Sequence, residues 1–211
     1  MILSLIGMSG SGKTHWAKQL EAAGFKRYSW DEMIEERLGD ELRQLGYKGI
    51  NDLAKWMGQP YEQQYAKNSA TYLRLEYDVM AEIVAQAKKH PDEHSIIDTT
   101  GSVIYMPDAL LKEMKSLSKL VYLYTPMHVQ EEMFQLYLAD PKPVIWGNSF
   151  TKRADESHRD ALARCYPQLL AHRTEQYKKL ANITMSYFLI HTDEFNYESF
   201  LEKVAPDYDF V

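Results

Sequence analysis

The sequence predicts a three-layer α/β/α domain built around a parallel sheet of about five strands. Short apolar runs alternate along the chain with longer segments of helical periodicity, and this alternation is typical of βαβ units. Crossovers of this kind imply a parallel sheet that helices cover on both faces. The candidate strands are residues 2–6, 25–30, 95–97, 120–124 and 183–190.

Length and composition are those of one globular domain. The chain has 211 residues, of which 45% are hydrophobic and 26% charged, and we expect a single domain spanning residues 1–211. With 24 Lys and Arg against 30 Asp and Glu, the net charge of −6 disfavours binding to nucleic acid or to an anionic membrane. The single cysteine, Cys165, cannot form an internal disulfide, so we expect a cytoplasmic location. A monomer and a homodimer both remain open.

Helical segments separate the candidate strands. The first ends where Gly24 can adopt the left-handed conformation that terminates helices, and the second is expected to stop at Gly39. Asn51 can cap the third. Pro141 follows the fifth, and Pro167 is expected to kink or divide the sixth. The predicted helices are residues 13–23, 31–38, 52–57, about 61–89, 129–138 and 154–180.

A glycine-rich motif joins the first strand to the first helix. Residues 7–14 read GMSGSGKT and match the pattern GxxxxGKT of a phosphate-binding loop, or P-loop. The backbone N–H groups of such a loop and the N-terminus of the following helix surround a phosphate. Lys13 is expected to reach the β- and γ-phosphates of ATP, and the Thr14 hydroxyl to bind Mg²⁺. The alternative is a glycine-rich turn that matches by chance. The predicted nucleotide-binding residues are Gly7, Ser9, Gly10, Ser11, Gly12, Lys13 and Thr14.

Asp98 follows directly after the third candidate strand. A carboxylate at this place is suited to hold Mg²⁺ beside Thr14, either directly or through a water molecule. Asp98 is therefore the second predicted metal residue. Alternatively, Asp98 only caps the turn into residues 99–101.

These residues resemble the shikimate kinase family, within the nucleoside monophosphate kinase group of P-loop proteins. The resemblance covers almost the whole chain, although only the P-loop is highly specific. Residues 25–39 look like the family's second strand and following helix, with Asp31 at the acceptor-binding aspartate and Ser29 where a second aspartate is usual. The resemblance implies an ATP- and Mg²⁺-dependent kinase whose acceptor is a small hydroxylated metabolite.

Two further segments resemble parts of the family's active site. Residues 99–102, reading TTGS, look like a glycine triplet beside the acceptor, which implies acceptor contacts from Thr100 and Gly101. Residues 142–144, reading KPV, look like the lid segment, with Lys142 in the place of an arginine.

The acceptor arginines of the family have one clear counterpart. Residues 173–184 resemble the C-terminal segment whose arginine binds the acceptor's carboxylate, and Arg173 takes that role. The other acceptor arginine is replaced, but Arg74 lies next to its place. The acceptor-binding helical region is then expected at about residues 31–76.

Phosphoryl transfer requires positioning and charge neutralisation more than covalent chemistry. We expect Lys13, Asp31 and Lys142 to be the catalytic residues, with Asp31 orienting the acceptor hydroxyl and taking its proton. Alternatively, Asp31 only caps the helix that it begins. Residues 139–164 are polar and rich in Lys and Arg, so we expect a lid that closes over ATP; an ordinary solvated loop is the alternative.

Two other functions remain open beside phosphorylation of a small metabolite. A nucleoside or nucleotide kinase ought to show a positive or amide-rich site for a base and a phosphate beyond Asp31. A non-catalytic regulatory module would bind the nucleotide tightly, without any ADP release that an acceptor stimulates.

Overall fold

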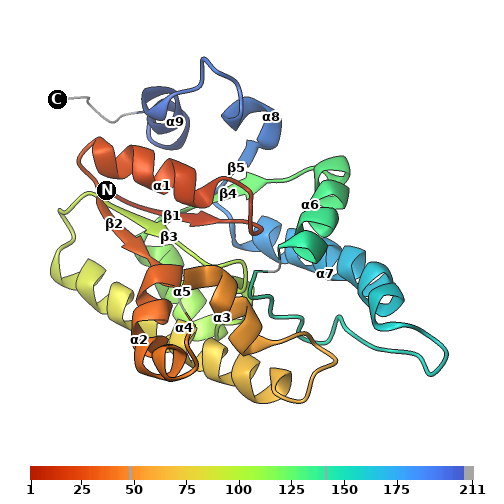
Figure 1. The fold of residues 1–211 in the computed structure, drawn as a ribbon. Helices are drawn as coiled ribbons and strands as arrows, with labels where there is room; N and C mark the ends of the chain where they lie inside the picture. The colour runs from red at the N-terminus through yellow and green to blue at the C-terminus, as the bar shows by residue number, and fades with distance from the viewer. Residues whose placement is uncertain (48, 141, 207–211) are drawn as a thin grey trace.

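The computed structural model describes residues 1–47, 49–140 and 142–206, and within these ranges it contains a five-stranded parallel sheet (Figure 1). The strand order is β2-β3-β1-β4-β5, and each neighbouring pair is parallel. The strands are β1 (Ile2–Ile6), β2 (Lys26–Ser29), β3 (Ser95–Asp98), β4 (Lys119–Tyr124) and β5 (Ile183–Ser186).

Helices cover both faces of this sheet (Figure 1). One face carries α1 (Lys13–Ala22), α8 (Tyr187–Ile190) and α9 (Tyr197–Val204). The opposite face carries the longer helices and a short 3₁₀ helix, which are α2 (Trp30–Gln44), α3 (Gly49–Met57), α4 (Tyr65–Lys89), η1 (Val103–Tyr105), α5 (Asp108–Leu117), α6 (Met127–Ala139) and α7 (His158–Leu180). None of the helices in the described ranges is long and apolar enough to cross a membrane.

The side chains of β1 show how the two layers of helices divide the core. Leu3 and Leu5 pack with Trp16 of α1, whereas Ile2 and Ile6 belong to the cluster formed with the longer helices. Successive side chains of a strand point to opposite faces, so burial of all five residues of β1 requires helices on both faces of the sheet. The predicted three-layer α/β/α architecture is therefore confirmed.

Two helix boundaries that were predicted from a glycine and an asparagine are wrong. Helix α2 continues through Gly39 to Gln44, because Leu42 extends the buried stripe of Ile34 and Leu38 by one more turn. Packing of that stripe outweighs the low helix propensity of a single glycine. Helix α3 begins at Gly49, so the predicted cap at Asn51 is wrong. Pro141, which was expected to follow helix α6, lies outside the described residues.

Helix α7 continues through Pro167 without a break, so the predicted division into two helices is wrong. Pro167 itself is exposed. The buried positions continue on both sides of the proline with helical spacing, including Leu162, Tyr166, Leu170 and Arg173. This shared face holds both halves of the helix against the same core.

Several short elements were not predicted. Helix α5 and helix α9 have no counterpart among the predicted segments, and the last strand is shorter than residues 183–190 because α8 begins at Tyr187. Each of these pieces is four to ten residues long. Over such lengths, helix and strand patterns are hard to distinguish from periodicity alone.

Strand register brings the predicted functional segments to one edge of the sheet. Asp98 pairs with Leu5 of β1 on one side and with Ser29 of β2 on the other. These residues stand at the carboxyl ends of their strands, and the P-loop leaves β1 at the same edge. In an open parallel sheet this edge is where ligands bind.

Candidate active site

The P-loop has the backbone conformation of a phosphate cradle. Gly7, Gly10 and Gly12 all have positive φ angles, of 151°, 80° and 94°. A Cβ atom at Gly7 would lie 2.8 Å from Ser11 Oγ and 2.9 Å from the Leu123 carbonyl oxygen, so this position has no room for a side chain. The loop therefore requires glycine for its shape, and loops of this shape turn backbone N–H groups towards an anion.

Lys13 lies within this loop and is buried. Its Nζ donates hydrogen bonds to the carbonyl oxygens of Gly7 and Met8, at 3.1 and 2.9 Å. Burial lowers the pKa of Lys13, while the nearby carboxylates of Asp98 and Asp31 oppose that shift. The lysine is thus held at the phosphate cradle, close enough to both predicted functional carboxylates to feel their charge.

Thr14 and Asp98 come together beside the cradle. Burial raises the pKa of Asp98, while the charge of Lys13 and a hydrogen bond with the Thr14 side chain act in the opposite direction. A hydroxyl and a carboxylate are oxygen ligands of the kind that Mg²⁺ prefers, with the remaining positions filled by phosphate and water. The two residues predicted to hold the metal therefore fit it chemically. Within the described ranges, no group of three or more His, Cys, Asp or Glu side chains forms a metal site without a substrate.

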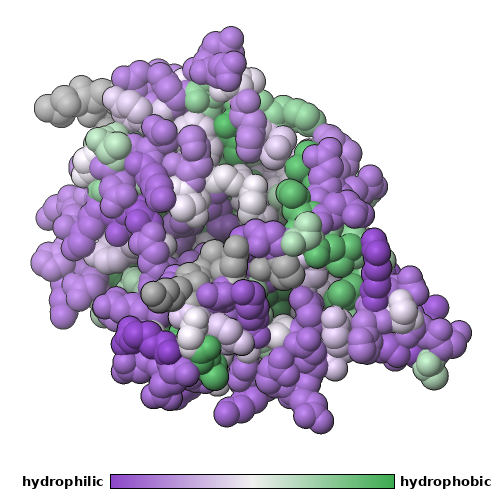
Figure 2. All heavy atoms as spheres, in the orientation of Figure 1, coloured by the Kyte–Doolittle hydropathy of each residue, from purple (hydrophilic) through white to green (hydrophobic). Residues whose placement is uncertain are grey.

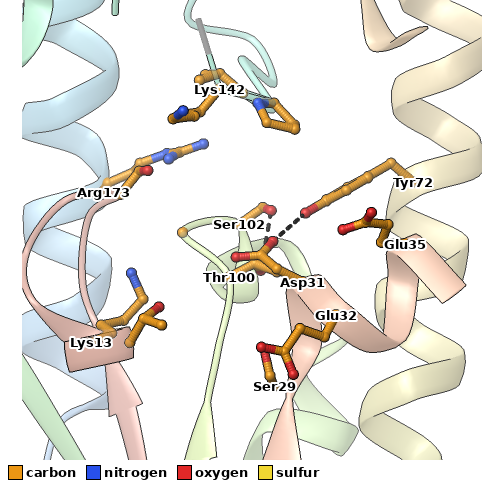
Figure 3. Close-up of a pocket in the computed structure, with 15 residues that line it drawn as sticks. Lys13, Ser29, Asp31, Glu32, Glu35, Tyr72, Thr100, Ser102, Lys142 and Arg173 are labelled. Atoms are coloured by element: carbon orange, nitrogen blue, oxygen red, sulfur yellow. Dashed lines mark hydrogen bonds between the residues drawn. The ribbon is translucent and has the colours of Figure 1, made fainter. Parts of the chain in front are cut away.

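A polar pocket of about 330 Å³ opens directly in front of Lys13 (Figure 3). It contains groups from the P-loop, from α2, from α4, from the loop after β3, from the segment after α6 and from α7. The lining residues are Ser9, Lys13, Thr14, Ser29, Asp31, Glu32, Glu35, Tyr72, Thr100, Gly101, Ser102, Lys142, Pro143, Val144 and Arg173.

Asp31 lines this pocket at the first turn of α2. The Tyr72 hydroxyl donates a hydrogen bond to Asp31 Oδ1 at 3.2 Å (Figure 3). Burial raises the pKa of Asp31, an effect that Lys13 opposes and Asp98 reinforces. Ser29 is the N-terminal flanking residue of α2, so Asp31 lies inside the helix rather than at its cap. Its carboxylate is placed where it can accept a hydrogen bond from an acceptor hydroxyl.

Glu76 lies behind the pocket wall and bonds to Thr100 and Ser102, which line it, and the sequence did not single Glu76 out as functional. It is fully buried on α4 and accepts hydrogen bonds from Thr100 Oγ1 and from Ser102 Oγ, the latter at 2.6 Å. Burial raises the pKa of Glu76 to about 7. A carboxylate one helical turn after Tyr72, on the apolar stripe of α4, was the signal that could have identified it.

Arg173 approaches the pocket from α7 and is buried. Its Nη2 donates a hydrogen bond to the Ile145 carbonyl oxygen at 2.7 Å, while its Nε has no partner in the described part of the chain. A Cβ atom at Gly101 would lie 3.0 Å from Arg173 Nη1 and 3.6 Å from the backbone nitrogen of Ser9. Glycine at position 101 therefore allows the guanidinium to sit beside the P-loop.

The lid segment reaches the pocket only at its beginning. Lys142 lies among the lining residues, and residues 147–157 extend away from the sheet as a loop (Figure 1). The Tyr65 hydroxyl donates to the Val144 carbonyl oxygen at 3.2 Å and accepts from the Trp146 backbone nitrogen at 2.7 Å. These bonds attach the start of the loop to α4.

Arg74 is separated from the other predicted acceptor residues. It is exposed on α4 and is not among the residues that line the pocket. Tyr72, two residues earlier, points into the pocket instead (Figure 3). Two steps of roughly 100° each around the helix account for the difference in direction.

A second pocket, of about 360 Å³, adjoins the tip of the P-loop at Ser9 and Gly10. Its walls are mainly apolar and include Val129 and Met133 of α6 together with Tyr187 at the start of α8. Figure 2 shows apolar surface gathered over α6 at this place. A flat aromatic group attached to a phosphate chain could lie here while the phosphates occupy the cradle.

Solved structures of similar shape cover nearly the whole chain. Shikimate kinase from Bacteroides thetaiotaomicron has a TM-score of 0.60 at 19% identity, with 98% of this chain and 97% of that chain covered. Shikimate kinase from Acinetobacter baumannii in complex with shikimate has a TM-score of 0.57 at 21% identity, with 96% and 89% covered. Shikimate kinase from Aquifex aeolicus gives 0.55 at 19%, with 98% and 93% covered. At these identities the likeness concerns the fold.

Comparison with protein-family models matches residues 2–176 to an AAA domain, AAA_33. The matched part runs from the first strand into α7 and includes the P-loop, Asp31 and Asp98. Comparison with curated protein sequences finds no match. Since the family model spans most of the chain, the protein belongs to the AAA_33 family of AAA domains, and its fold is the P-loop kinase fold that the shikimate kinases share.

Proposed function

We propose that this protein is a kinase that transfers the γ-phosphoryl group of Mg·ATP to a hydroxyl group of a small metabolite. The observation that carries the proposal is one pocket of about 330 Å³ in which the P-loop lysine and the Asp31 carboxylate both take part. A phosphate cradle alone would serve any nucleotide-binding protein. A half-buried carboxylate that lines the same cavity of metabolite size as the cradle lysine supports transfer to a second substrate.

On the nucleotide side, the P-loop amides and Lys13 bind the β- and γ-phosphates. Thr14 and Asp98 are the residues that would hold Mg²⁺, which neutralises charge on the phosphate oxygens when it is bound. The apolar pocket beside Ser9 and Gly10 takes the adenine ring. These assignments use every predicted nucleotide-binding residue in the role that the sequence suggested.

On the acceptor side, Asp31 accepts a hydrogen bond from the reacting hydroxyl and takes its proton as transfer proceeds. The acceptor oxygen then forms a bond to the γ-phosphorus, while the bond from that phosphorus to the bridging oxygen of ADP breaks. Arg173, beside the P-loop, neutralises charge on the moving phosphoryl group. Lys142 lines the same pocket and contributes charge in the same way, in exchange for its present ion pair with Asp140. Tyr72 keeps the Asp31 carboxylate oriented through its hydrogen bond.

The experiment is a screen for acceptor-stimulated formation of ADP from Mg·ATP. Neutral, acidic and aminated alcohols, shikimate and nucleoside monophosphates are each added to the purified protein, and ADP is measured by a coupled assay. We expect at least one hydroxylated metabolite to raise ADP formation well above the rate with water alone. Tight Mg·ATP binding with no stimulation by any compound would contradict the kinase proposal and support a regulatory module. Stimulation by nucleoside monophosphates alone would identify a nucleotide kinase.

A further inference from the structure

Four polar side chains gather on the acceptor side of the pocket, and we call them the acceptor wall. They are Asp31 of α2, Tyr72 of α4, and Thr100 and Ser102 of the loop after β3, and all four line the pocket. Figure 3 shows them grouped together, with Lys13 apart from them at the P-loop. A hydroxyl that attacks the γ-phosphorus therefore lies between this wall and the phosphates.

Glu76 lies behind the acceptor wall and accepts hydrogen bonds from both hydroxyls of the loop. Thr100 Oγ1 and Ser102 Oγ donate to the same oxygen, Glu76 Oε1, the latter at 2.6 Å. Ser102 Oγ is 3.3 Å from Thr100 Oγ1, so the carboxyl oxygen is its nearer acceptor. All three residues are buried. Since a hydroxyl has only one hydrogen, both hydrogens are directed at Glu76 rather than into the pocket.

This direction of the two hydroxyls holds in both ionisation states of Glu76. Burial raises the pKa of Glu76 to about 7, so both states occur near neutral pH. Its second oxygen, Oε2, is buried and has no hydrogen-bond partner among the described residues. A proton on the carboxyl group therefore goes to Oε2, because Oε1 already receives two hydrogen bonds. In either state, Oε1 continues to accept from Thr100 and Ser102.

The other half of the acceptor wall has the same polarity. The Tyr72 hydroxyl donates its only hydrogen to Asp31 Oδ1, at 3.2 Å. Asp31 itself, when ionised for transfer, has only acceptor oxygens. All four side chains of the wall therefore offer lone pairs to a ligand, and none of the three hydroxyls has a hydrogen left to donate. Such a wall binds groups that donate hydrogen bonds and disfavours groups that can only accept them.

We infer that Glu76 is a positioning residue that makes the acceptor wall selective for hydrogen-bond donors, and that the acceptor is a polyol with further hydroxyl groups beside the one that is phosphorylated. A second hydroxyl of the acceptor donates to Thr100 or Ser102, whereas an ether, a ketone or a fluorine at that place meets only lone pairs. Glu76 acts through these two residues and does not touch the acceptor. The inference rests on the proposed kinase function and names the substrate class of that site.

Replacement of single hydroxyl groups tests the inference. Glycerol is compared with propane-1,2-diol and 3-fluoropropane-1,2-diol, and glucose with its monodeoxy and monofluoro derivatives. Fluorine has nearly the size of a hydroxyl group but no hydrogen to donate. We expect at least one position where loss of the hydroxyl lowers kcat/KM about tenfold or more, and where fluorine is no better than hydrogen. If no position matters, or if fluorine restores the rate wherever a hydroxyl matters, the inference is overturned and the kinase proposal stands.

The variants E76L and E76Q assign this selectivity to Glu76. Leucine fills the space without accepting a hydrogen bond, so Thr100 and Ser102 can turn their hydrogens into the pocket. We expect E76L to reduce the preference for hydroxyl over fluorine by about tenfold. Glutamine keeps an acceptor oxygen in place of Oε1, so E76Q should retain the preference. An unchanged preference in E76L, or its loss in both variants, would contradict the role of Glu76. Any electronic effect of fluorine on the reacting hydroxyl is the same in all three proteins.

The variant T100V gives the same readout from the wall itself if E76L does not fold. Valine has nearly the shape of threonine but no hydroxyl, so T100V should also narrow the difference between hydroxyl and fluorine, and an unchanged difference would overturn the inference. Calorimetry with Mg·ATP shows that each variant is folded. If the acceptor screen finds a substrate while both polyol sets remain inert, the inference fails alone. If no compound of any class stimulates ADP formation, the kinase proposal fails and the acceptor class fails with it.

Discussion

Asp31 is surrounded by groups that change its proton affinity in opposite directions. Burial and the charge of Asp98 raise its pKa, and Lys13 and the Tyr72 hydroxyl lower it. The balance is a raised pKa, which suits a group that must be ionised before transfer and must take a proton during it. The sequence identified Asp31 and the helix to which it belongs, but not the Tyr72 hydroxyl, which comes from a different helix, α4.

The variant D31N tests this role. An amide has nearly the same shape but cannot take the proton, so we expect kcat to fall by about two to four orders of magnitude while Mg·ATP affinity stays near that of the wild type. Because the pKa of Asp31 is raised, kcat/KM of the wild type should decline as the pH falls through it, and the acidic limb should vanish in D31N. Calorimetry with Mg·ATP and steady-state rates provide the two measurements. An unchanged rate would remove Asp31 from the mechanism.

A second prediction concerns the contribution of Glu76 to the stability of the fold. Its pKa is raised by burial from its ordinary value of 4.5 to about 7, so the folded state holds a proton that the unfolded state releases between these values. The stability that this proton confers is fully present below about pH 4.5 and is lost as the pH rises through about 7, by roughly 3 kcal/mol in all. E76Q should retain the hydrogen bonds from Thr100 and Ser102 and lose this part of the pH dependence.

Urea unfolding of the wild type and of E76Q across this pH range measures the difference. E36Q serves as the control, since Glu36 is exposed and the substitution there changes charge without changing a buried group. Parallel pH profiles for E76Q and the wild type would show that Glu76 is not the buried group that loses its proton.

At the scale of elements, periodicity correctly predicted most helices and strands. Boundaries that were predicted from single glycine, asparagine or proline residues were wrong in several places. Gly39 and Pro167 both appeared to interrupt a helix, and in both cases a buried stripe on each side of the residue continued unbroken. For the predicted lid, the structure limits the part near the site to the first residues of the segment. Hydrogen bonds from Tyr65 and Arg173 fix residues 144–146 to α4 and α7, and the outer part of the segment leaves the site.

Hydrogen–deuterium exchange can distinguish the two parts of the predicted lid. We expect a non-hydrolysable ATP analogue with Mg²⁺ to slow amide exchange in peptides covering residues 142–147, because Lys142, Pro143 and Val144 line the same pocket as the P-loop lysine. Exchange at residues 148–157 should change little, since these residues extend away from the pocket. Equal protection of both parts would instead indicate that residues 139–164 close as one lid.

At the scale of the whole molecule, the sequence predicted the architecture because strand and helix patterns are local. The site was harder to predict from the sequence, because its pocket is lined by residues from separate elements, such as Asp31, Tyr72, Lys142 and Arg173. The P-loop could be identified in full because it is one continuous segment with a fixed backbone shape. Arg74 was predicted to bind the acceptor because it lies next to the expected arginine position, but adjacent residues of a helix point in different directions, and Arg74 is exposed.

Ligand binding should stabilise the entire domain. The P-loop joins β1 to α1, and its Thr14 side chain hydrogen-bonds with Asp98 at the end of β3, so a ligand bound there acts on the central strands of the sheet. Mg·ATP at about 100 times its Kd should add about 2.7 kcal/mol to the free energy of unfolding. For a chain of this length we expect a rise in Tm of roughly 5–10 °C by differential scanning calorimetry. Adenosine, which lacks phosphates, is the control and should give a much smaller rise; no rise with Mg·ATP or Mg·GTP would contradict nucleotide binding.

The hydrogen bonds of Lys13 to the carbonyl oxygens of Gly7 and Met8 have one more consequence. When a triphosphate enters the cradle, the lysine exchanges two backbone acceptors for phosphate oxygens, so only the difference between these partners contributes to ground-state affinity. The leaving oxygen of ADP gains negative charge during transfer, and the backbone carbonyls offer no equivalent of that change. In the proposed reaction, the ammonium group of this side chain should therefore act more on the speed of transfer than on how firmly the nucleotide is retained.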